Sequence, residues 1–243
     1  MYLDGVFVDM MWYKAFSVWL MLRLGLNVLF QDIDIVWFRD PFPYFHQYIT
    51  EATASGRTPP DMFLSDDGQR STVRYSPFYA NSGFYYLVAS KRTLNVAWNI
   101  MLSFDVMQSS GSHQNVFTQR LLEGLDIAQL HTQSMHQDNF TNGATYHHRP
   151  NFMKLIQQHK AHPYMFHMCW TANKAQKFEF FRKVKMWYTL EKFTPNAFAP
   201  EGAVTKLVEK TKHLKTADEK WASVASAVCR VMEGAPRQYH GNI

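Results

Sequence analysis

The chain has 243 residues, of which 47% are hydrophobic and 16% aromatic, so it can bury a sizeable core and is not disordered as a whole. Lys and Arg outnumber Asp and Glu by 25 to 20, but the basic residues do not alternate with aromatic ones in a repeated stripe. This makes nucleic acid a weak expectation as a partner and leaves an anionic small molecule such as a nucleotide. With only two cysteines, Cys169 and Cys229, no disulfide framework is expected. Cysteine usage therefore does not distinguish an oxidising from a reducing cellular compartment.

The N-terminal region is apolar but does not predict a membrane span. Its most apolar part, Met10–Leu24, contains two basic residues and is too short to cross a bilayer. We expect a buried helix over Met11–Leu24, ended by Gly25. Met1–Asp9 is expected to be a short strand or loop.

The rest of the chain predicts strands that alternate with helices. The expected strands are 27–39, Asp61–Leu64, Phe84–Ala89, Leu125–His131 and Tyr164–Met168. The expected helices are Lys91–Met107 capped by Ser90, a short one from His113 to near Gly124, Glu179–Leu190, and one or two in Glu201–Glu233. The expected loops are Tyr44–Pro60 (with a short helix as an alternative), Gln69–Ala80, Ser109–Ser112 and Gln133–Pro150. The pattern favours an α/β domain over residues 1–195 and a helical appendage over 196–243.

Two carboxylates interrupt the apolar stretch Asn27–Pro43. Its β-branched and aromatic residues predict a strand buried on both faces and closed by Asp40-Pro41. Because residues i and i+2 of a strand point to the same side, Asp32 and Asp34 are expected to project together. Unpaired, they would be costly to bury and would repel each other, which a cation such as Mg²⁺ or Mn²⁺ would relieve. A turn or a salt-bridged surface pair is the alternative.

Five motifs share their order and spacing with a known family. They are Gly25–Pro41, Asn81–Tyr86 with Ser90–Thr93, His113–Phe117, Phe140–Gly143, and His167–Trp170 with Lys177. Together they resemble glycosyltransferase family 77, plant and algal enzymes of the nucleotide-diphospho-sugar transferase type that extend arabinose, xylose or galactose chains. The chain departs from the pattern at His113, where Asp is usual, and at Asn173, where Gly is usual. The strand–helix–strand unit that opens such domains has no place before Met1, so we expect the N-terminal nucleotide-binding unit to be missing.

The resemblance implies a GT-A-like mixed sheet flanked by helices. It also implies metal-dependent, retaining transfer of a sugar from a UDP-sugar to a hydroxyl of a glycan or glycoprotein. Mn²⁺ (or Mg²⁺) would be held by Asp32, Asp34 and His167. The implied location is the Golgi lumen, as a type II membrane protein whose anchor is missing here, with the cytoplasm as the alternative.

The family pattern also implies catalytic and substrate-binding residues. Gln114 falls where related enzymes place a side chain under the anomeric carbon; because an amide is a poor nucleophile, we expect it to stabilise an oxocarbenium-like centre. Asp67, or Asp66, is expected to bind a donor or acceptor hydroxyl and is the second catalytic candidate. The substrate-binding candidates are Lys14, Asn81, Ser82, Gly83, His113, Asn142, Gly143, Trp170 and Lys177, with Lys174 as an alternative to Lys177.

Plainer roles are open for several of these residues. His167 could be an ordinary polar residue with its hydrogen bonds satisfied, and Lys177 could belong to a basic surface. Lys14 could extend its ammonium group to solvent from an apolar helix face, and Trp170 could be a core residue. Two other functions also stay open. One is a catalytically inactive, transferase-like binding or scaffold protein, which the missing N-terminal unit and the departures at His113 and Asn173 favour. The other is a metal-dependent phosphate-ester hydrolase.

Overall fold

The computed structural model describes residues 5–67 and 80–187. Contacts between Cα atoms divide the chain into Met1–Trp187 and Tyr188–Ile243, and the second unit lies outside the described residues. So do residues 69–79 of the expected loop, the end of the expected helix Glu179–Leu190, the expected helices in Glu201–Glu233 and the 195/196 boundary. These expectations stay predictions.

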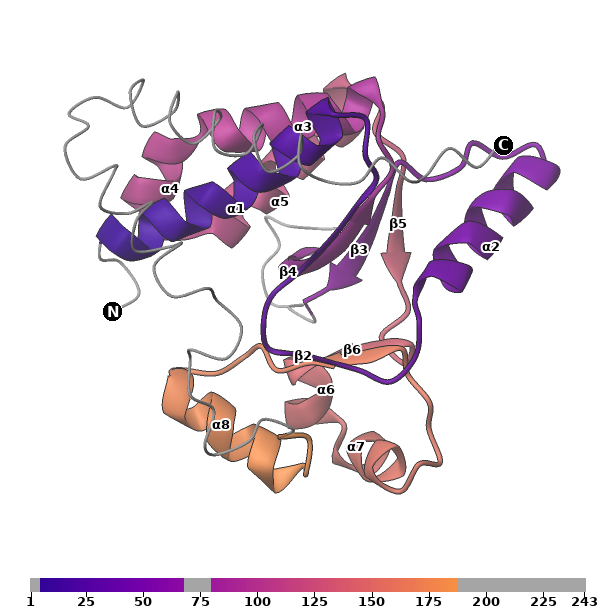
Figure 1. The fold of residues 1–243 in the computed structure, drawn as a ribbon, viewed down its shortest axis with the longest axis vertical. Coiled ribbons are helices and arrows are strands. Elements are labelled where there is room, and N and C mark those ends of the chain that lie inside the picture. Colours follow the sequence, from indigo (N-terminus) through magenta and orange to yellow (C-terminus); the bar gives the residue numbers. More distant parts are fainter. Residues whose placement is uncertain (1–4, 68–79, 188–243) are drawn as a thin grey trace, which may run out of the picture. The chain divides into compact units, whose positions relative to one another are not determined.

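Two mixed sheets form the centre of the first unit (Figure 1). The larger sheet has the order β1-β4-β3-β5, with β1 at Val28–Gln31, β3 at Met62–Asp66, β4 at Ala80–Leu87 and β5 at Thr132–Met135. The smaller sheet has the order β2-β7-β6, with β2 at Ile35–Trp37, β6 at Phe140–Asn142 and β7 at Met165–His167. The pairs β3–β5 and β6–β7 are parallel and the other pairs are antiparallel. The expected mixed α/β fold is confirmed.

Helices flank both sheets. Figure 1 shows α1 (Gly5–Arg23), α3 (Lys91–Leu102), α4 (Phe104–Ser110) and α5 (His113–Ile127) gathered on one side of the larger sheet, and α2 (Phe42–Ala54) on the other. Beside the smaller sheet lie α6 (Gly143–His148), α7 (Pro150–Gln157) and α8 (Lys174–Lys183). No helix of the described residues combines the length and apolarity that crossing a membrane requires.

Alternate residues of β3 and β4 build separate cores on the two faces of the larger sheet. Met62 and Leu87 pack with α1, α3 and α5, whereas Phe63 and Tyr86 pack with Phe45 of α2. The rings of Phe45 and Tyr86 are stacked with their centroids 4.5 Å apart. Because successive side chains of a strand point to opposite faces, the sheet is covered on both sides and only its ends stay open.

The stretch that carries Asp32 and Asp34 is two strands rather than one. β1 pairs with β4 in the larger sheet and β2 pairs with β7 in the smaller one, so the chain changes sheets at residues 32–34. Strand residues on both sides of the break are only partly buried, and Ile33 is fully exposed. The prediction of a single strand buried on both faces is therefore wrong.

Several other boundaries differ from the predictions. α1 begins at Gly5, so the strand or loop expected at its start is wrong from residue 5 onward. The helix allowed as an alternative within Tyr44–Pro60 is confirmed as α2, which takes up most of the expected loop because Phe45 and Ala52 are buried. The helix expected over Lys91–Met107 breaks at Ser103, between α3 and α4. The expected flexible break is the Gly111–Ser112 junction, with Gly111 in the left-handed region at φ 62°.

The second half of the chain shows the same kind of difference. α5 continues to Ile127, and β5 begins only at Thr132, so the strand expected over Leu125–His131 is wrong. Buried residues of α5 such as Leu121 pack into the core between α1, α3 and the sheet, which tertiary packing rather than local propensity decides. The region expected to be irregular, Gln133–Pro150, contains β6 and α6. α8 begins at Lys174, earlier than expected. β3 and β7 lie within two residues of their predicted bounds, whereas β4 begins at Ala80, four residues before the expected start at Phe84.

Candidate functional site

A polar cleft of about 240 Å³ opens at the junction of the two sheets. Its lining combines residues that come from the β1–β2 connection, the end of β3, the start of β4, the start of α5, the end of β7 and the segment that leads into α8. The lining residues are Asp32, Asp34, Asp67, Asn81, Ser82, Gly83, Gln114, His167, Cys169, Trp170, Thr171 and Lys177. All of them except Cys169 and Thr171 are candidates from the sequence.

Asp32, Asp34 and His167 form the centre of this cleft. One potential ligand atom from each of the three side chains lies within 4.8 Å of the other two, and His167 Nε2 is 3.4 Å from Asp34 Oδ1. The two aspartates converge because their backbones are bound to different sheets: Asp32 N donates to Gly83 O at 2.7 Å, and Met168 N donates to Asp34 O at 3.1 Å. Two carboxylates and one imidazole are a donor set that suits Mn²⁺, and their spacing leaves room for one ion.

A lysine is paired with each of the two carboxylates. Lys14 Nζ on α1 donates to Asp32 Oδ1 at 2.7 Å, and Lys177 Nζ on α8 donates to Asp34 Oδ2 at 2.5 Å. Burial would raise the pKa of Asp34, but hydrogen bonds and charge from His167 and Lys177 outweigh it and hold that pKa far below its ordinary value. Asp34 is therefore ionised at neutral pH and can accept a cation.

Asp67, which also lines the cleft, accepts hydrogen bonds from the side chains of Asn81, Trp170 and Gln114. Asn81 Nδ2 donates to Asp67 Oδ1 at 2.5 Å, and Trp170 Nε1 donates to Asp67 Oδ2 at 3.2 Å and to its backbone oxygen at 2.9 Å. Burial raises the pKa of Asp67 in spite of these hydrogen bonds. Trp170 adopts φ 61°, a conformation that is uncommon for a bulky residue, so its indole is held as a positioning group for Asp67.

Gln114 lies at the N-terminus of α5, which Ser112 caps through its side chain. The side-chain oxygen of Gln114 faces the start of β4, 3.3 Å from Ser82 N and 3.4 Å from Ser82 Oγ. This fixes the amide against the floor of the cleft, on a rigid helix rather than a loop.

Gly83 leaves space for the ligand residues. A Cβ at this position would lie 2.6 Å from His167 Cε1 and 2.7 Å from Asp32 Oδ2. His167 Nδ1 has no hydrogen-bond partner among the described residues, so the orientation of its ring depends on β7 and on this close packing. Gly83 was predicted to bind substrate; its position makes it the residue that lets Asp32 and His167 approach.

Four predicted substrate-binding residues are not among those that line the cleft. Lys14 reaches it only through its hydrogen bond to Asp32. His113 is buried in the core beneath α1 and α3. Asn142 caps α6, where its side chain accepts from Ala144 N at 3.0 Å, and it donates to the backbone oxygen of Asp66 at 2.6 Å. Gly143 is buried, and a Cβ there would lie 2.1 Å from the carbonyl oxygen of Cys169. Gly143 therefore packs against the segment that carries Cys169 and Trp170, whereas His113 belongs to the core that α1, α3 and α5 form against the larger sheet.

Sequence reasoning missed Cys169 and Thr171 as lining residues. Both flank Trp170 in the segment after His167, so their place beside a candidate ligand was the available signal. Burial, and then the negative charge of Asp67, raises the pKa of the Cys169 thiol, which therefore stays protonated and unreactive at neutral pH.

His113 should make the fold sensitive to acid. Burial, followed by the charge of Lys14, lowers the pKa of His113 to about 3, whereas the unfolded chain has a histidine pKa of about 6.5. Between these values only the unfolded chain binds the proton, so the free energy of unfolding falls as the pH is lowered through this window. From about pH 7.5 to about pH 5 the expected loss is about 2 kcal/mol.

Urea denaturation at the two pH values measures this loss. His113→Leu should lack it, whereas His162→Gln, which removes an exposed histidine, should retain it. An equal loss of stability in the wild type and in His113→Leu would contradict the assignment.

Comparison with known proteins decides the family. The sequence profile described as nucleotide-diphospho-sugar transferase matches residues 2–181. The chain belongs to this family. The match covers every residue of the cleft, from the aspartate pair to Lys177.

Two curated relatives of this transferase family carry enzyme names. Beta-arabinofuranosyltransferase RAY1 of Arabidopsis thaliana is 25% identical over 181 residues, which are 68% of this chain and 31% of the relative. UDP-galactose:fucoside alpha-3-galactosyltransferase of Dictyostelium discoideum is 36% identical over 73 residues, which are 30% of this chain and 10% of the relative. The chain thus spans less than a third of either relative. Among solved structures, the galactosyltransferase LgtC in complex with donor and acceptor sugar analogues is 13% identical, with a TM-score of 0.39 over 72% of this chain and 69% of that one.

Proposed function

We propose that the chain carries the donor site of a metal-dependent, retaining glycosyltransferase that moves a sugar from a UDP-sugar to a hydroxyl of a glycan or glycoprotein. The observation that carries the proposal is the convergence of Asp32, Asp34 and His167 in one open cleft, in a member of the nucleotide-diphospho-sugar transferase family. His167 lies near the C-terminal end of the family match, more than 130 positions after the two aspartates, so the three side chains meet only when the first unit is folded.

Asp32, Asp34 and His167 would hold Mn²⁺, or Mg²⁺ less well, because one ligand is an imidazole nitrogen. When bound, the ion would neutralise the diphosphate as the sugar–oxygen bond breaks. Lys177 is hydrogen-bonded to Asp34 and lies within reach of the same phosphates, where its ammonium would add a second positive charge.

Gln114 and Asp67 are proposed to act on the sugar. The amide of Gln114, fixed against Ser82, would stabilise positive charge at the anomeric carbon while the acceptor hydroxyl attacks from the side of the leaving group. Asp67, oriented by Asn81 and Trp170, would accept a hydrogen bond from a hydroxyl of the donor or acceptor. Retention of configuration follows from attack on the face that the diphosphate leaves.

Two other functions were considered. Two of the sequence departures that favoured a scaffold without a donor site do not affect the cleft, because His113 is in the core and Asn173 caps α8 by accepting from Gln176 N at 2.9 Å. A phosphate-ester hydrolase uses the same kind of metal site and is separated from a transferase by its products. Location in the Golgi lumen is proposed from the family alone.

The experiment that tests the proposal measures UDP binding by calorimetry with Mn²⁺ and with EDTA. We expect UDP to bind at least about 10-fold more tightly with Mn²⁺, since an ion held by Asp32, Asp34 and His167 would attract the diphosphate. Equal affinity in the two conditions would refute the metal assignment. Incubation with UDP-galactose or UDP-arabinose, with and without candidate glycan acceptors, then separates transfer from hydrolysis.

A further inference from the structure

Each carboxylate of the aspartate pair carries its own lysine, and the two lysines come from opposite ends of the described chain. Lys14 lies in the middle of α1 and Lys177 in the first turn of α8. Their side chains are 16% and 28% exposed, and those of Asp32 and Asp34 are 34% and 10% exposed. Such partly buried charges are less screened by solvent than surface pairs, so their interactions affect binding equilibria.

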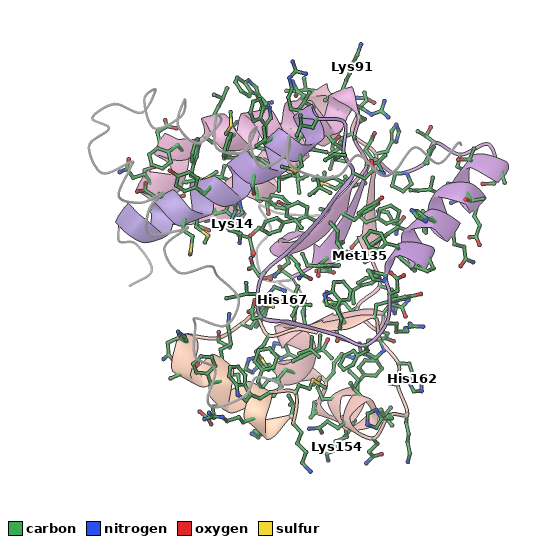
Figure 2. All side chains as sticks on the ribbon, in the orientation of Figure 1. Lys14, Lys91, Met135, Lys154, His162 and His167 are labelled. Carbon is green, nitrogen blue, oxygen red and sulfur yellow. The ribbon has the colours of Figure 1, made fainter. Side chains whose placement is uncertain are left out.

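Lys14 is directed to Asp32 by its surroundings. Figure 2 shows Lys14 on the side of α1 that is turned toward His167. Its Nζ lies 5.2 Å from the centroid of the Phe30 ring, on the strand that leads to Asp32. Position 113, where the resemblance leads one to expect Asp, holds a buried histidine that offers Lys14 no negative charge. The ammonium therefore pairs with Asp32.

The negative charges of Asp32 and Asp34 are already balanced by the two lysines. The two ammonium groups compensate the two carboxylates one to one, at distances of 2.7 Å and 2.5 Å. A divalent cation bound alone would have to displace the ammonium groups or lie beside them, and it would leave two positive charges uncompensated in a partly buried site. A diphosphate arriving with the cation supplies the missing negative charge and gives both lysines a new partner.

We propose that Lys14 and Lys177 compete with the divalent cation for Asp32 and Asp34, so that the cation binds weakly alone and strongly together with a nucleoside diphosphate. The inference rests on the proposed donor site and adds how binding of the cation and binding of the nucleotide depend on each other there. The lysines neutralise Asp32 and Asp34 before a ligand binds, and the diphosphate would release these carboxylates by drawing the ammonium groups to itself. Cation and nucleotide then raise each other's affinity by the same factor.

The variant Lys14→Met tests the competition directly. It should bind Mn²⁺ in the absence of nucleotide about tenfold more tightly than the wild type, because a competing charge near the ligand oxygens is gone. The factor by which Mn²⁺ enhances UDP binding should fall by about the same amount. The first quantity is measured from the electron paramagnetic resonance signal of free Mn²⁺, and the second by calorimetry with UDP.

Lys177→Met is the second variant, in case Lys14→Met folds poorly, and it should also tighten Mn²⁺ binding in the absence of nucleotide. Lys91→Met removes the same charge from α3, where Lys91 points away from the cleft (Figure 2), and should leave both quantities unchanged. If Mn²⁺ enhances UDP binding to the wild type but neither cleft variant binds Mn²⁺ alone more tightly, the competition is refuted and the donor site stands. If Mn²⁺ does not enhance UDP binding to the wild type, the donor site fails and the competition with it.

Discussion

Asp34→Asn should reduce Mn²⁺-dependent binding of UDP by at least about 100-fold, because changes in residues that only support metal ligands already cost 10- to 100-fold. The substitution keeps the size of the side chain and removes its charge. Asp34 Oδ1 lies 3.4 Å from His167 Nε2 and Asp34 Oδ2 lies 2.5 Å from Lys177 Nζ, so the substitution removes the carboxylate that stands between these two groups. Calorimetry with UDP and Mn²⁺ measures the effect.

Asp138→Asn is the matched control. It removes the same charge from a half-exposed ion pair with Arg149, outside the residues that line the cleft. Circular dichroism of both variants shows whether the fold is kept. Retention of wild-type affinity by Asp34→Asn would remove this residue from the metal site.

Gly83→Ala should weaken the same binding by crowding the site rather than by removing a ligand. The new methyl group would lie within 2.7 Å of both His167 and Asp32, so at least one of the two must move. Because both are candidate ligands, we expect a loss of at least about 10-fold in Mn²⁺-dependent UDP affinity. We also expect a loss of about 1–3 kcal/mol in the free energy of unfolding from overpacking.

Gly124→Ala separates crowding of the site from general loss of stability. A Cβ at Gly124 would lie 2.5 Å from Val96 Cγ2, a contact in the core between α3 and α5. Thermal denaturation and calorimetry on both variants give the comparison. Equal UDP affinity in Gly83→Ala and Gly124→Ala would show that the space at Gly83 has no part in the site.

Local signals predicted much of the fold. Ser90 forms the expected cap of α3, with its side chain accepting from Thr93 N and that of Thr93 accepting from Ser90 N. Gly25 follows the end of α1 with φ 77°. Such features depend on a few neighbouring residues, so they are legible in the sequence. The strand expected over Leu125–His131 failed because a short apolar run suits a buried helix as well as a strand.

The predicted reason for the approach of Asp32 and Asp34 was wrong, although the approach itself is seen. They do not share one face of a strand; they lie at a crossing between two sheets, and the pairing of β1 with β4 and of β2 with β7 sets their positions. Strand partners far apart in sequence leave no mark on a period-two pattern. The same reason hid the role of Gly83, since its neighbours Asp32 and His167 lie far from it along the chain.

By itself, the sequence determined which chemical groups are present and in which order: an acidic pair in an apolar run, an amide at the start of a helix, and an imidazole followed by a lysine. Only the tertiary structure decided which of these groups meet. Asp34 and Lys177 are 143 positions apart, and Lys14 and Asp32 come from a helix and a sheet crossing. Charge pairing at such separations depends on how helices and sheets pack, because a side chain reaches only the partners that the fold brings to it.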